Sequence, residues 1–309
     1  WVPSWRGLFG ERLRNTVYGW PEPAFDSFYR KRKVLGFTVH VVTDPDMVGR
    51  VLLDNKENYL RPRLAQRILS PLIGNGLLSS EGEDWRKQRR IVAPTFAPGA
   101  VLKMSHAIGD VAARQTAGWL NGTIRTDMAR MATDATMAII ADTLFSSDPR
   151  LTARQAGEHI DNLIVAGGQA RFTTMLGVQD LDPSPTMRRA RRGREYLRST
   201  LTALVRERGP SGGADDFFGG LIRALYDQFP PGEAEALAVD NAITFYVAGH
   251  ETTANALAWT IYLLAAQPAL QEEARAEALA ALDEDVETLA DRLPLLRQIL
   301  DESMRLYPP

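Results

Sequence analysis

The residues best suited to chemistry lie in the short stretch VAGHETTAN, residues 247–255. It sits inside AITFYVAGHETTANALAWTIYLLAAQP, which is otherwise almost entirely apolar and ends at Pro268. The apolar pattern is broken by Gly249, His250, Glu251 and the Thr252-Thr253 pair. A glycine inside a helix costs about 1 kcal/mol relative to alanine, and a buried carboxylate without a partner costs more. Several local rules are usually broken together only where function requires it, so this stretch is predicted to hold a site.

One alternative is a zinc site, because His250-Glu251 matches the start of the HExxH helix, in which two histidines four residues apart bind the metal. The position four residues after His250 is Ala254, however. The other histidines of the chain are too far from it in sequence to form a metal-binding pair at helical spacing, and they are His40, His106 and His159. The pattern therefore argues against zinc.

A second alternative is purely structural. Thr252 and Thr253 would hydrogen-bond to carbonyls one turn earlier, Glu251 would have a buried partner, and Gly249 would allow another helix to pack closely. That interpretation suits a single threonine better than a whole cluster of such residues.

A third interpretation gives the cluster a chemical role. Ala248 and Thr252 are four residues apart and lie on one face of a helix. A threonine hydroxyl bonded to the carbonyl of Ala248 would loosen the helical ladder and open a bulge there. Such a bulge would admit a small ligand or water beside a hydroxyl, with Glu251 next to it as a proton carrier. The stretch is thus predicted to be a proton-delivery site set into a helix.

The elements that position this site are predicted to be mainly helical. The apolar stretch predicts a helix from about residue 233 to 267, roughly 50 Å long at about 1.5 Å per residue. Two further helices follow Pro268. Amphipathic helices are predicted within 99–208, with breaks at Asn121-Gly122, at Asp148-Pro149 and at 182–185.

The N-terminal part of the chain has a different character. The β-branched residues 34–43 predict a short strand pair at the edge of a small sheet. Asp44 is expected to cap a helix that begins at Pro45. The proline and glycine residues of 55–82 predict a long irregular connection of the kind that often lines a site. The fold class is therefore mainly α with a small β region.

Composition narrows the functional class. The 309 residues are 45% hydrophobic and 24% charged, with a formal net charge of -2, which is typical of a globular protein with no general attraction to nucleic acid. No signal peptide is visible, and His250 and Glu251 interrupt the longest apolar stretch, so we expect a cytoplasmic protein without a membrane anchor. The chain contains no cysteine, which excludes disulfides and thiolate ligands within these residues.

Residues 248–253 resemble the cytochrome P-450 haem-thiolate monooxygenases. The signature of that family is alanine or glycine, glycine, any residue, an acid, threonine, then threonine or serine, and AGHETT fits it with His250 at the variable position. Two more stretches are similar to family motifs in the same order. Trp85 and Arg89, within GNGLLSSEGEDWRKQRR, fit the W-x-x-x-R helix, and Glu302 and Arg305, within DESMRLYPP, fit the ExxR helix.

The ExxR spacing alone has little specificity, because an acid and an arginine three residues apart commonly form a helical ion pair. The chain has the same spacing at Glu11/Arg14, Glu83/Arg86, Glu195/Arg198 and Glu272/Arg275. The context LYPP and the position C-terminal to the AGHETT stretch distinguish Glu302/Arg305 from these pairs.

The resemblance implies the cytochrome P-450 fold in a single domain over 1–309, with a small β-sheet in residues 1–60 and a helical region in 61–309. It implies haem b as cofactor and insertion of one oxygen atom from O2 into a hydrophobic substrate. Electrons would come ultimately from NAD(P)H, through a ferredoxin and its reductase or a fused reductase.

The resemblance also assigns roles to individual residues. Thr252 would hydrogen-bond the bound dioxygen, and Glu251 would relay protons. Ala248 and Gly249 would leave room above the iron. Trp85 and Arg89 would bind the haem propionates. Glu302 and Arg305 would be structural, without a part in the chemistry.

The family's axial ligand is a cysteine C-terminal to ExxR, and the chain stops before that loop. We therefore expect a C-terminally truncated fragment of a soluble, bacterial-like member, inactive by itself, with the iron ligand beyond Pro309 and no metal ligand within these residues.

Rival functions remain open. A haem isomerase or dehydratase of the same fold tends to lack the acid–alcohol pair that Glu251-Thr252 forms here. A peroxide-driven hydroxylase resembles the family with an arginine near position 251. A non-catalytic binding relic is the remaining alternative. Apolar residues in the regions expected to contact substrate favour a fatty acid, alkane or terpenoid, and a packed core predicts the same residues: Leu64, Ile68, Leu72, Phe172 and Phe245.

Overall fold

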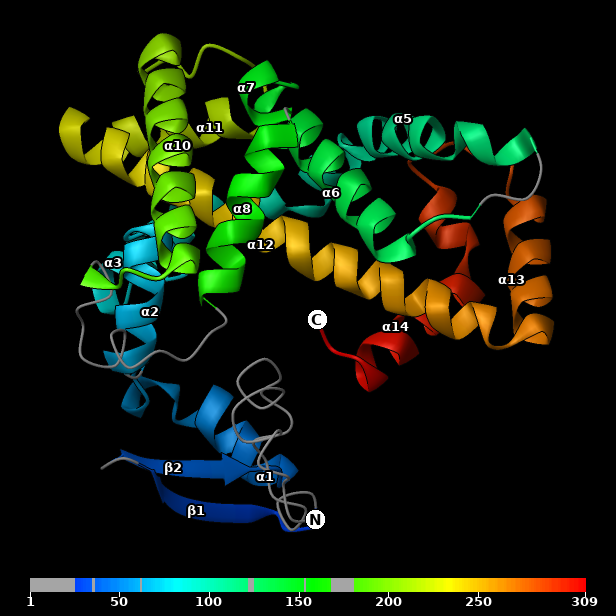
Figure 1. Ribbon diagram of the computed structural model, residues 1–309, viewed down its shortest axis with the longest axis horizontal. Coiled ribbons are helices and arrows are strands. Elements are labelled where there is room, and N and C mark those ends of the chain that lie inside the picture. Colours follow the sequence, from blue (N-terminus) through cyan, green and yellow to red (C-terminus); the bar gives the residue numbers. More distant parts are fainter. Residues whose placement is uncertain (1–25, 35–36, 62, 122–124, 153, 168–180) are drawn as a thin grey trace. The chain divides into compact units, whose positions relative to one another are not determined.

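The computed structural model describes residues 26–34, 37–61, 63–121, 125–152, 154–167 and 181–309 (Figure 1). Contacts divide the chain into two compact units. The first unit combines residues 1–72 with 164–188, and the second combines residues 73–163 with 189–309. The second unit contains every residue predicted to take part in the chemistry or to bind haem, so the first is described briefly.

The first unit contains a two-stranded antiparallel hairpin. Strand β1 (Tyr29–Val34) pairs with β2 (Phe37–Val42), with Tyr29 opposite Val42. The predicted strand pair is confirmed, but β1 begins earlier than the β-branched residues suggested. Its sequence, YRKRKV, puts charges on both faces and so shows no apolar alternation. Short, charged strands of this kind are common at sheet edges.

The first helix begins as predicted. Helix α1 (Pro45–Gly49) has proline in its first turn, and the Asp44 carboxylate accepts a hydrogen bond from the Met47 amide at 2.9 Å. The predicted irregular connection over 55–82 is wrong in part, because α2 (Arg63–Ile73) lies within it. Pro71 falls in the last turn of α2, where it does not end the helix. The helix ends at Gly74, whose φ of +74° is the left-handed conformation that glycine favours at helix ends.

The second unit is built around α12 (Pro231–Ala265), the predicted long helix (Figure 1). Helices α6 (Met128–Phe145) and α11 (Phe217–Gln228) pack against it, and α5 (Ser105–Thr116) packs on α6. This unit also contains α3 (Gly82–Val92), α4 (Pro98–Leu102), α7 (Pro149–Thr152), most of α8 (Arg154–Gly167) and most of α10 (Pro185–Arg208). The breaks at Asp148-Pro149 and before Pro185 are confirmed, whereas Gly122 lies outside the described residues.

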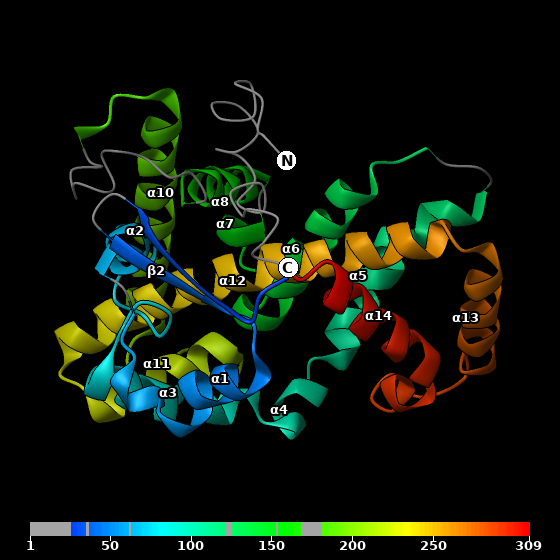
Figure 2. The same ribbon diagram turned by 90° about the horizontal axis from the view of Figure 1, so that it is seen from below.

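The two helices predicted after Pro268 are α13 (Pro268–Ala280) and α14 (Pro294–Leu306). Figure 2 shows the chain turning back, so that α14 lies beside the C-terminal half of α12. Glu277 of α13 fixes this return, because its two carboxylate oxygens accept hydrogen bonds from the Leu295 and Leu296 amides at 2.8 and 2.9 Å. These amides belong to the first turn of α14, which has no partners for them within the helix.

Aromatic side chains form the core between α6, α11 and α12. The rings of Phe145 and Tyr246 meet edge to face with centroids 5.6 Å apart, and Phe145 meets Phe218 in the same way at 5.2 Å. All three side chains are buried. The Tyr246 hydroxyl donates to the Leu151 carbonyl, which satisfies its polar end inside the core.

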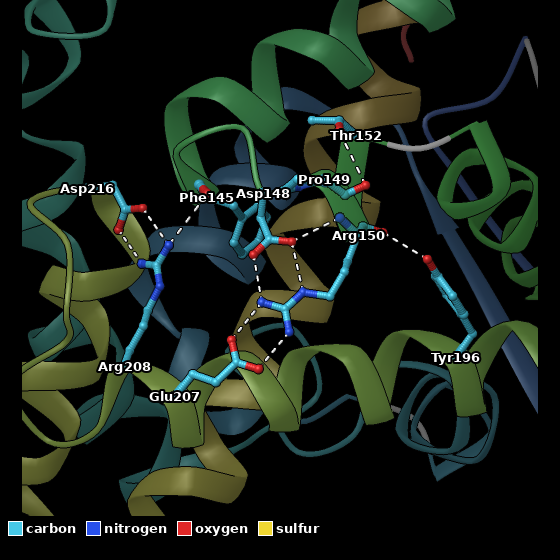
Figure 3. Close-up of polar contacts among 9 residues, drawn as sticks. All are labelled: Phe145, Asp148, Pro149, Arg150, Thr152, Tyr196, Glu207, Arg208 and Asp216. Atoms are coloured by element: carbon cyan, nitrogen blue, oxygen red, sulfur yellow. Dashed lines mark hydrogen bonds and ion pairs between the residues drawn. The ribbon is translucent and has the colours of Figure 1, made fainter.

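Two arginines join the helix ends at one side of this unit (Figure 3). Arg150 donates to Asp148 and, through two hydrogen bonds of 2.8 Å, to Glu207 of α10. Its carbonyl accepts the Tyr196 hydroxyl at 2.8 Å. The Asp148 pKa lies below its ordinary value, chiefly because of the hydrogen bond from Arg150. Arg208 makes the second junction, with Asp216.

Helices in the described part of the chain include none that is both long and apolar enough to cross a membrane.

Candidate active site

The predicted site stretch is regular helix. Thr252 Oγ1 donates to the Ala248 carbonyl at 2.8 Å, as the sequence predicts. The expected bulge is not found, because α12 is continuous from Pro231 to Ala265. Thr244 and Thr260 of the same helix make the same bond one turn back, at 2.8 and 2.7 Å. A threonine hydroxyl therefore shares its carbonyl acceptor with the helical ladder here without breaking it.

The carboxyl of Glu251 differs from that of an ordinary glutamate in its pKa. The residue is accessible to solvent, yet partial burial of its carboxyl raises its pKa above the ordinary 4.5. The neighbouring His250 works in the opposite direction, and the negative charge of Asp161 adds to the increase. A carboxyl with a raised pKa holds its proton closer to neutral pH, which a general acid requires.

Gly249 faces helix α6. A Cβ atom at this position would lie 3.1 Å from Ile140 Cδ1, closer than side chains normally approach. The missing side chain therefore permits close helix packing, as the structural alternative predicts for this residue. The expectation that Gly249 also leaves room above the haem iron stays a prediction.

An apolar pocket of about 380 Å³ lies beside this contact. Helix α12 contributes Phe245, Ala248, Gly249 and Thr253 to its wall, and α6 with Phe96 forms the rest. Among the residues expected to contact substrate, Phe245 is in this wall, Phe172 lies outside the described residues, and the side chains of Leu64 and Ile68 are not described.

His250 has a structural environment that the sequence did not indicate. Only 2% of the residue is exposed, and its Nε2 atom lies 3.4 Å from Asp161 Oδ1 of α8. Its carbonyl accepts a hydrogen bond from Thr136 of α6 at 3.2 Å. Because residues two apart point to roughly opposite sides of a helix, His250 faces away from Thr252.

The W-x-x-x-R pair lies on α3. The Arg89 guanidinium carbon is 5.5 Å from the centre of the Trp85 ring, so the two side chains meet one turn apart as predicted. Arg89 is exposed and Trp85 is half-buried. Within the described part of the chain, neither the indole N–H nor the guanidinium donates to another side chain. An indole donor and a guanidinium donor together suit the carboxylates of an anionic ligand.

Glu302 and Arg305 form a two-bond ion pair on α14, with Nε–Oε2 and Nη2–Oε1 distances of 2.7 Å. The Arg305 hydrogen bond lowers the Glu302 pKa. Both side chains are largely exposed, and Glu83 and Arg86 make a comparable pair on α3. The ion pair by itself therefore does not separate the predicted motif from its surroundings.

Sequence reasoning missed a buried polar cluster between these elements. Asp240 and Asn241 of α12 are 6% and 0% exposed, and both bind the loop that leads into α3. Gln88 of α3 joins them and is 2% exposed. The available indication was the adjacent polar pair in the apolar run AVDNAITF.

Comparisons with known proteins identify the family. The sequence model for "Cytochrome P450" matches residues 31–309. A cyclooctat-9-en-7-ol 5-monooxygenase of Streptomyces melanosporofaciens is 32% identical over 87% of this chain and 59% of its own length. Cytochrome P450 714D1 of Oryza sativa subsp. japonica is 29% identical over 99% of the chain and 55% of its length. An 11-oxo-beta-amyrin 30-oxidase of Glycyrrhiza uralensis is 30% identical over 87% of the chain and 54% of its own length.

The chain therefore spans little more than half the length of these relatives. The match covers both the α3 pair and the acid–threonine stretch of α12, and it extends through the α14 ion pair. On this evidence the chain belongs to the cytochrome P450 family.

Proposed function

We propose that the whole protein is a haem-dependent monooxygenase that inserts one oxygen atom from O2 into a hydrophobic small molecule. The observation that carries this proposal is the Glu251-Thr252 pair at the middle of α12, with the hydroxyl bonded back to Ala248 and the carboxyl shifted to a higher pKa.

The residues present fit haem b. Trp85 and Arg89 offer adjacent donors with no other acceptor among the described side chains, and the haem carboxylates would be their ligands. When bound, haem would supply the reductive activation of O2. The chain has no cysteine, so a thiolate ligand would come from outside these 309 residues.

Thr252 and Glu251 would divide the handling of protons. The Thr252 proton is directed at the Ala248 carbonyl, so the lone pairs of Oγ1 are available to accept a hydrogen bond from water. Glu251, one residue earlier, would exchange a proton with that water and with solvent. Ala248 would leave space for the water on the same face of the helix.

The substrate is proposed to be hydrophobic. The pocket beside Ala248 has a volume of about 380 Å³, which lies in the range of small-molecule sites, and its wall is mostly apolar. Two relatives are named as a cyclooctat-9-en-7-ol 5-monooxygenase and an 11-oxo-beta-amyrin 30-oxidase. A terpenoid is accordingly the first class to screen, followed by fatty acids and alkanes.

Electrons are proposed to come from NAD(P)H through a ferredoxin and its reductase or a fused reductase, in the cytoplasm. Helix α3 supports an acidic donor, because Lys87 and Arg90 are exposed on it. Arg86 of the same helix is paired with Glu83.

The test is the reduced carbon monoxide spectrum of the whole protein expressed with haem. The proposal expects the absorption band that gives the family its name, and a protein that binds no haem would overturn it. Arg89→Leu should weaken haem retention, because it removes a carboxylate donor. Arg90→Leu is the matched control, since it removes an exposed arginine of the same helix from outside the Trp85 pair.

A further inference from the structure

The loop before α3 is attached to α12 by buried hydrogen bonds. The Asn75 amide donates to Asp240 Oδ2 at 2.7 Å, and the Leu77 amide donates to Asn241 Oδ1 at 2.8 Å. Arg198 of α10 binds the other Asp240 oxygen at 2.5 Å. The loop can approach this closely because it contains Gly76, where a Cβ atom would lie 2.7 Å from Thr244 Oγ1.

Gln88 and Asn241 connect α3 itself to α12, and we call this pair the amide clamp. Asn241 Nδ2 donates to Gln88 Oε1 at 2.9 Å and to the Leu237 carbonyl at 3.0 Å. Gln88 Nε2 donates to the Asn75 carbonyl at 3.1 Å. Each amide group has a donor bond and an acceptor bond, so each can be oriented in only one way.

The amide clamp lies close in sequence to the predicted site on both helices. Gln88 is the residue before Arg89 and lies three residues after Trp85. Asn241 lies seven residues before Ala248 and eleven before Thr252. At about 100° per residue, both offsets return to within about 20° of the same direction, so Asn241, Ala248 and Thr252 lie on one face of α12.

The clamp therefore sets the position of the Trp85-Arg89 pair along α12. It also sets the face of α12 on which the pair lies. Helix α3 also packs on α11 and on the turn that follows it, and apolar side-chain contacts in general tolerate small shifts. A buried amide pair is not tolerant in this way, because a shift of one residue would break the Asn241–Gln88 bond and leave the Gln88 side-chain carbonyl oxygen buried without its donor.

We propose that Gln88 and Asn241 are positioning residues, whose amide–amide bond sets the register of the haem-carboxylate donors on α3 relative to the Ala248–Thr252 face of α12. This inference rests on the proposed function for its consequence, but the register itself can be measured without haem.

The absence of cysteine from the chain makes that measurement simple. Lys87→Cys and Asn255→Cys, both at exposed positions, place one spin label on α3 and one on α12. Pulsed electron paramagnetic resonance on the 309-residue chain then gives the distance distribution between the labels. The expected result is one narrow distribution for the parent, and a shift or broadening of a few Å for Gln88→Met and for Asn241→Leu.

Thr260→Val is the matched control, because it removes a buried hydroxyl bond from α12 at a position that the clamp does not touch. It should leave the distribution unchanged. If Asn241→Leu does not fold, Gln88→Met decides the question, since Asn241 keeps its bonds to Leu77 and Leu237 in that variant. An unaltered distribution in Gln88→Met overturns the proposal.

The whole protein loaded with haem provides the second readout. The clamp variants should release haem to a scavenger protein about tenfold faster than the parent, the factor that corresponds to the one buried hydrogen bond that both variants lose, between Gln88 and Asn241. A wild-type protein that takes up no haem contradicts the proposed function and leaves the spin-label result standing. Normal haem uptake with an unchanged release rate in both clamp variants contradicts the positioning role alone.

Discussion

The guanidinium of Arg208 binds the carboxylate of Asp216 through two hydrogen bonds, of 2.6 and 2.8 Å, and less than a tenth of either side chain is exposed (Figure 3). The pair joins the last residue of α10 to the N-cap of α11. Asp216 also accepts from the Gly219 amide at 2.7 Å and from the Ser146 hydroxyl at 2.7 Å. The ends of α6 and α10 and the start of α11 are thereby held at one point.

Arg208→Met should destabilise the fold by about 3–5 kcal/mol, because it leaves the Asp216 charge buried without its cation. Urea unfolding followed by circular dichroism would measure the loss. Arg206→Met is the matched control on the same helix, since the Arg206 side chain, which pairs with Glu235, is mostly exposed and its removal should change little. An equal loss of unfolding free energy in the two variants would contradict the prediction that burial makes the Arg208–Asp216 pair important.

Asp216 should also govern part of the acid stability. Burial alone would raise its pKa, but the bonds from Arg208, Gly219 and Ser146 outweigh it and leave the pKa below the ordinary 3.8. A lowered pKa in the folded state stabilises the fold above pH 3.8, and this contribution is lost as the pH falls through the folded value. Asp216→Asn keeps the helix cap but should flatten the pH dependence of stability below about pH 4. An unchanged acid limb in a pH series of unfolding curves would refute this.

Ionisation of Glu251 should change the stability of the fold in the opposite direction to that of Asp216. Because its folded pKa is raised above 4.5, the ionised side chain disfavours folding, and this cost is absent below pH 4.5 and grows as the pH rises. Glu251→Gln is therefore expected to stabilise the chain at pH 7 and to have no effect at pH 4. Thermal unfolding at both pH values tests the difference, and a destabilised variant at pH 7 would show that the carboxylate has a structural partner.

Gly249 and Ile140 should be coupled. Gly249→Ala gains up to about 1 kcal/mol of helix propensity but brings a methyl group to 3.1 Å from Ile140 Cδ1, so the net change is expected to be near zero or unfavourable. Ile140→Val removes that Cδ1 atom. In the Ile140→Val background, Gly249→Ala should therefore show the full gain of helix propensity. A double-mutant cycle with no coupling energy would contradict the packing role.

Thr252→Val should uncouple electron consumption from product in the whole protein, because the hydroxyl that would hold the proton-donating water is removed. Thr252→Ser should retain coupling. Thr260→Val tests the specificity, since Thr260 makes the same bond one turn back on the same helix and lies outside the acid–alcohol pair. Product formed per NAD(P)H consumed is the measurement, and full coupling in Thr252→Val would exclude the proposed role.

Much of the fold follows from local patterns. Helix α12 could be predicted because an apolar run ends in prolines on both sides, and α1 because Asp44 precedes Pro45. Strand β1 could not, since its charged residues carry no periodic pattern and only pairing with β2 makes it a strand. Helix α2 was not predicted, because Pro71 suggested a break in the chain. In the structure Pro71 lies in the last turn of α2 and does not interrupt it.

The site divides in the same way. Thr252 and its bond to Ala248 could be predicted, because residues four apart in a helix meet by geometry. The amide clamp could not, because Gln88 and Asn241 are 153 positions apart and each is an ordinary polar residue in its own segment. The orientation of His250 toward α8 likewise depends on how helices pack, which a single helix pattern does not contain.

The carboxylate of Glu277 has a consequence for the evolution of this part of the family. By holding the first amides of α14, it fixes where that helix starts regardless of the path taken from the end of α13. The cost of a longer surface connection rises slowly with length. The segment between Ala280 and Pro294 can therefore gain or lose residues in descendants of this sequence while α14 keeps its place beside α12.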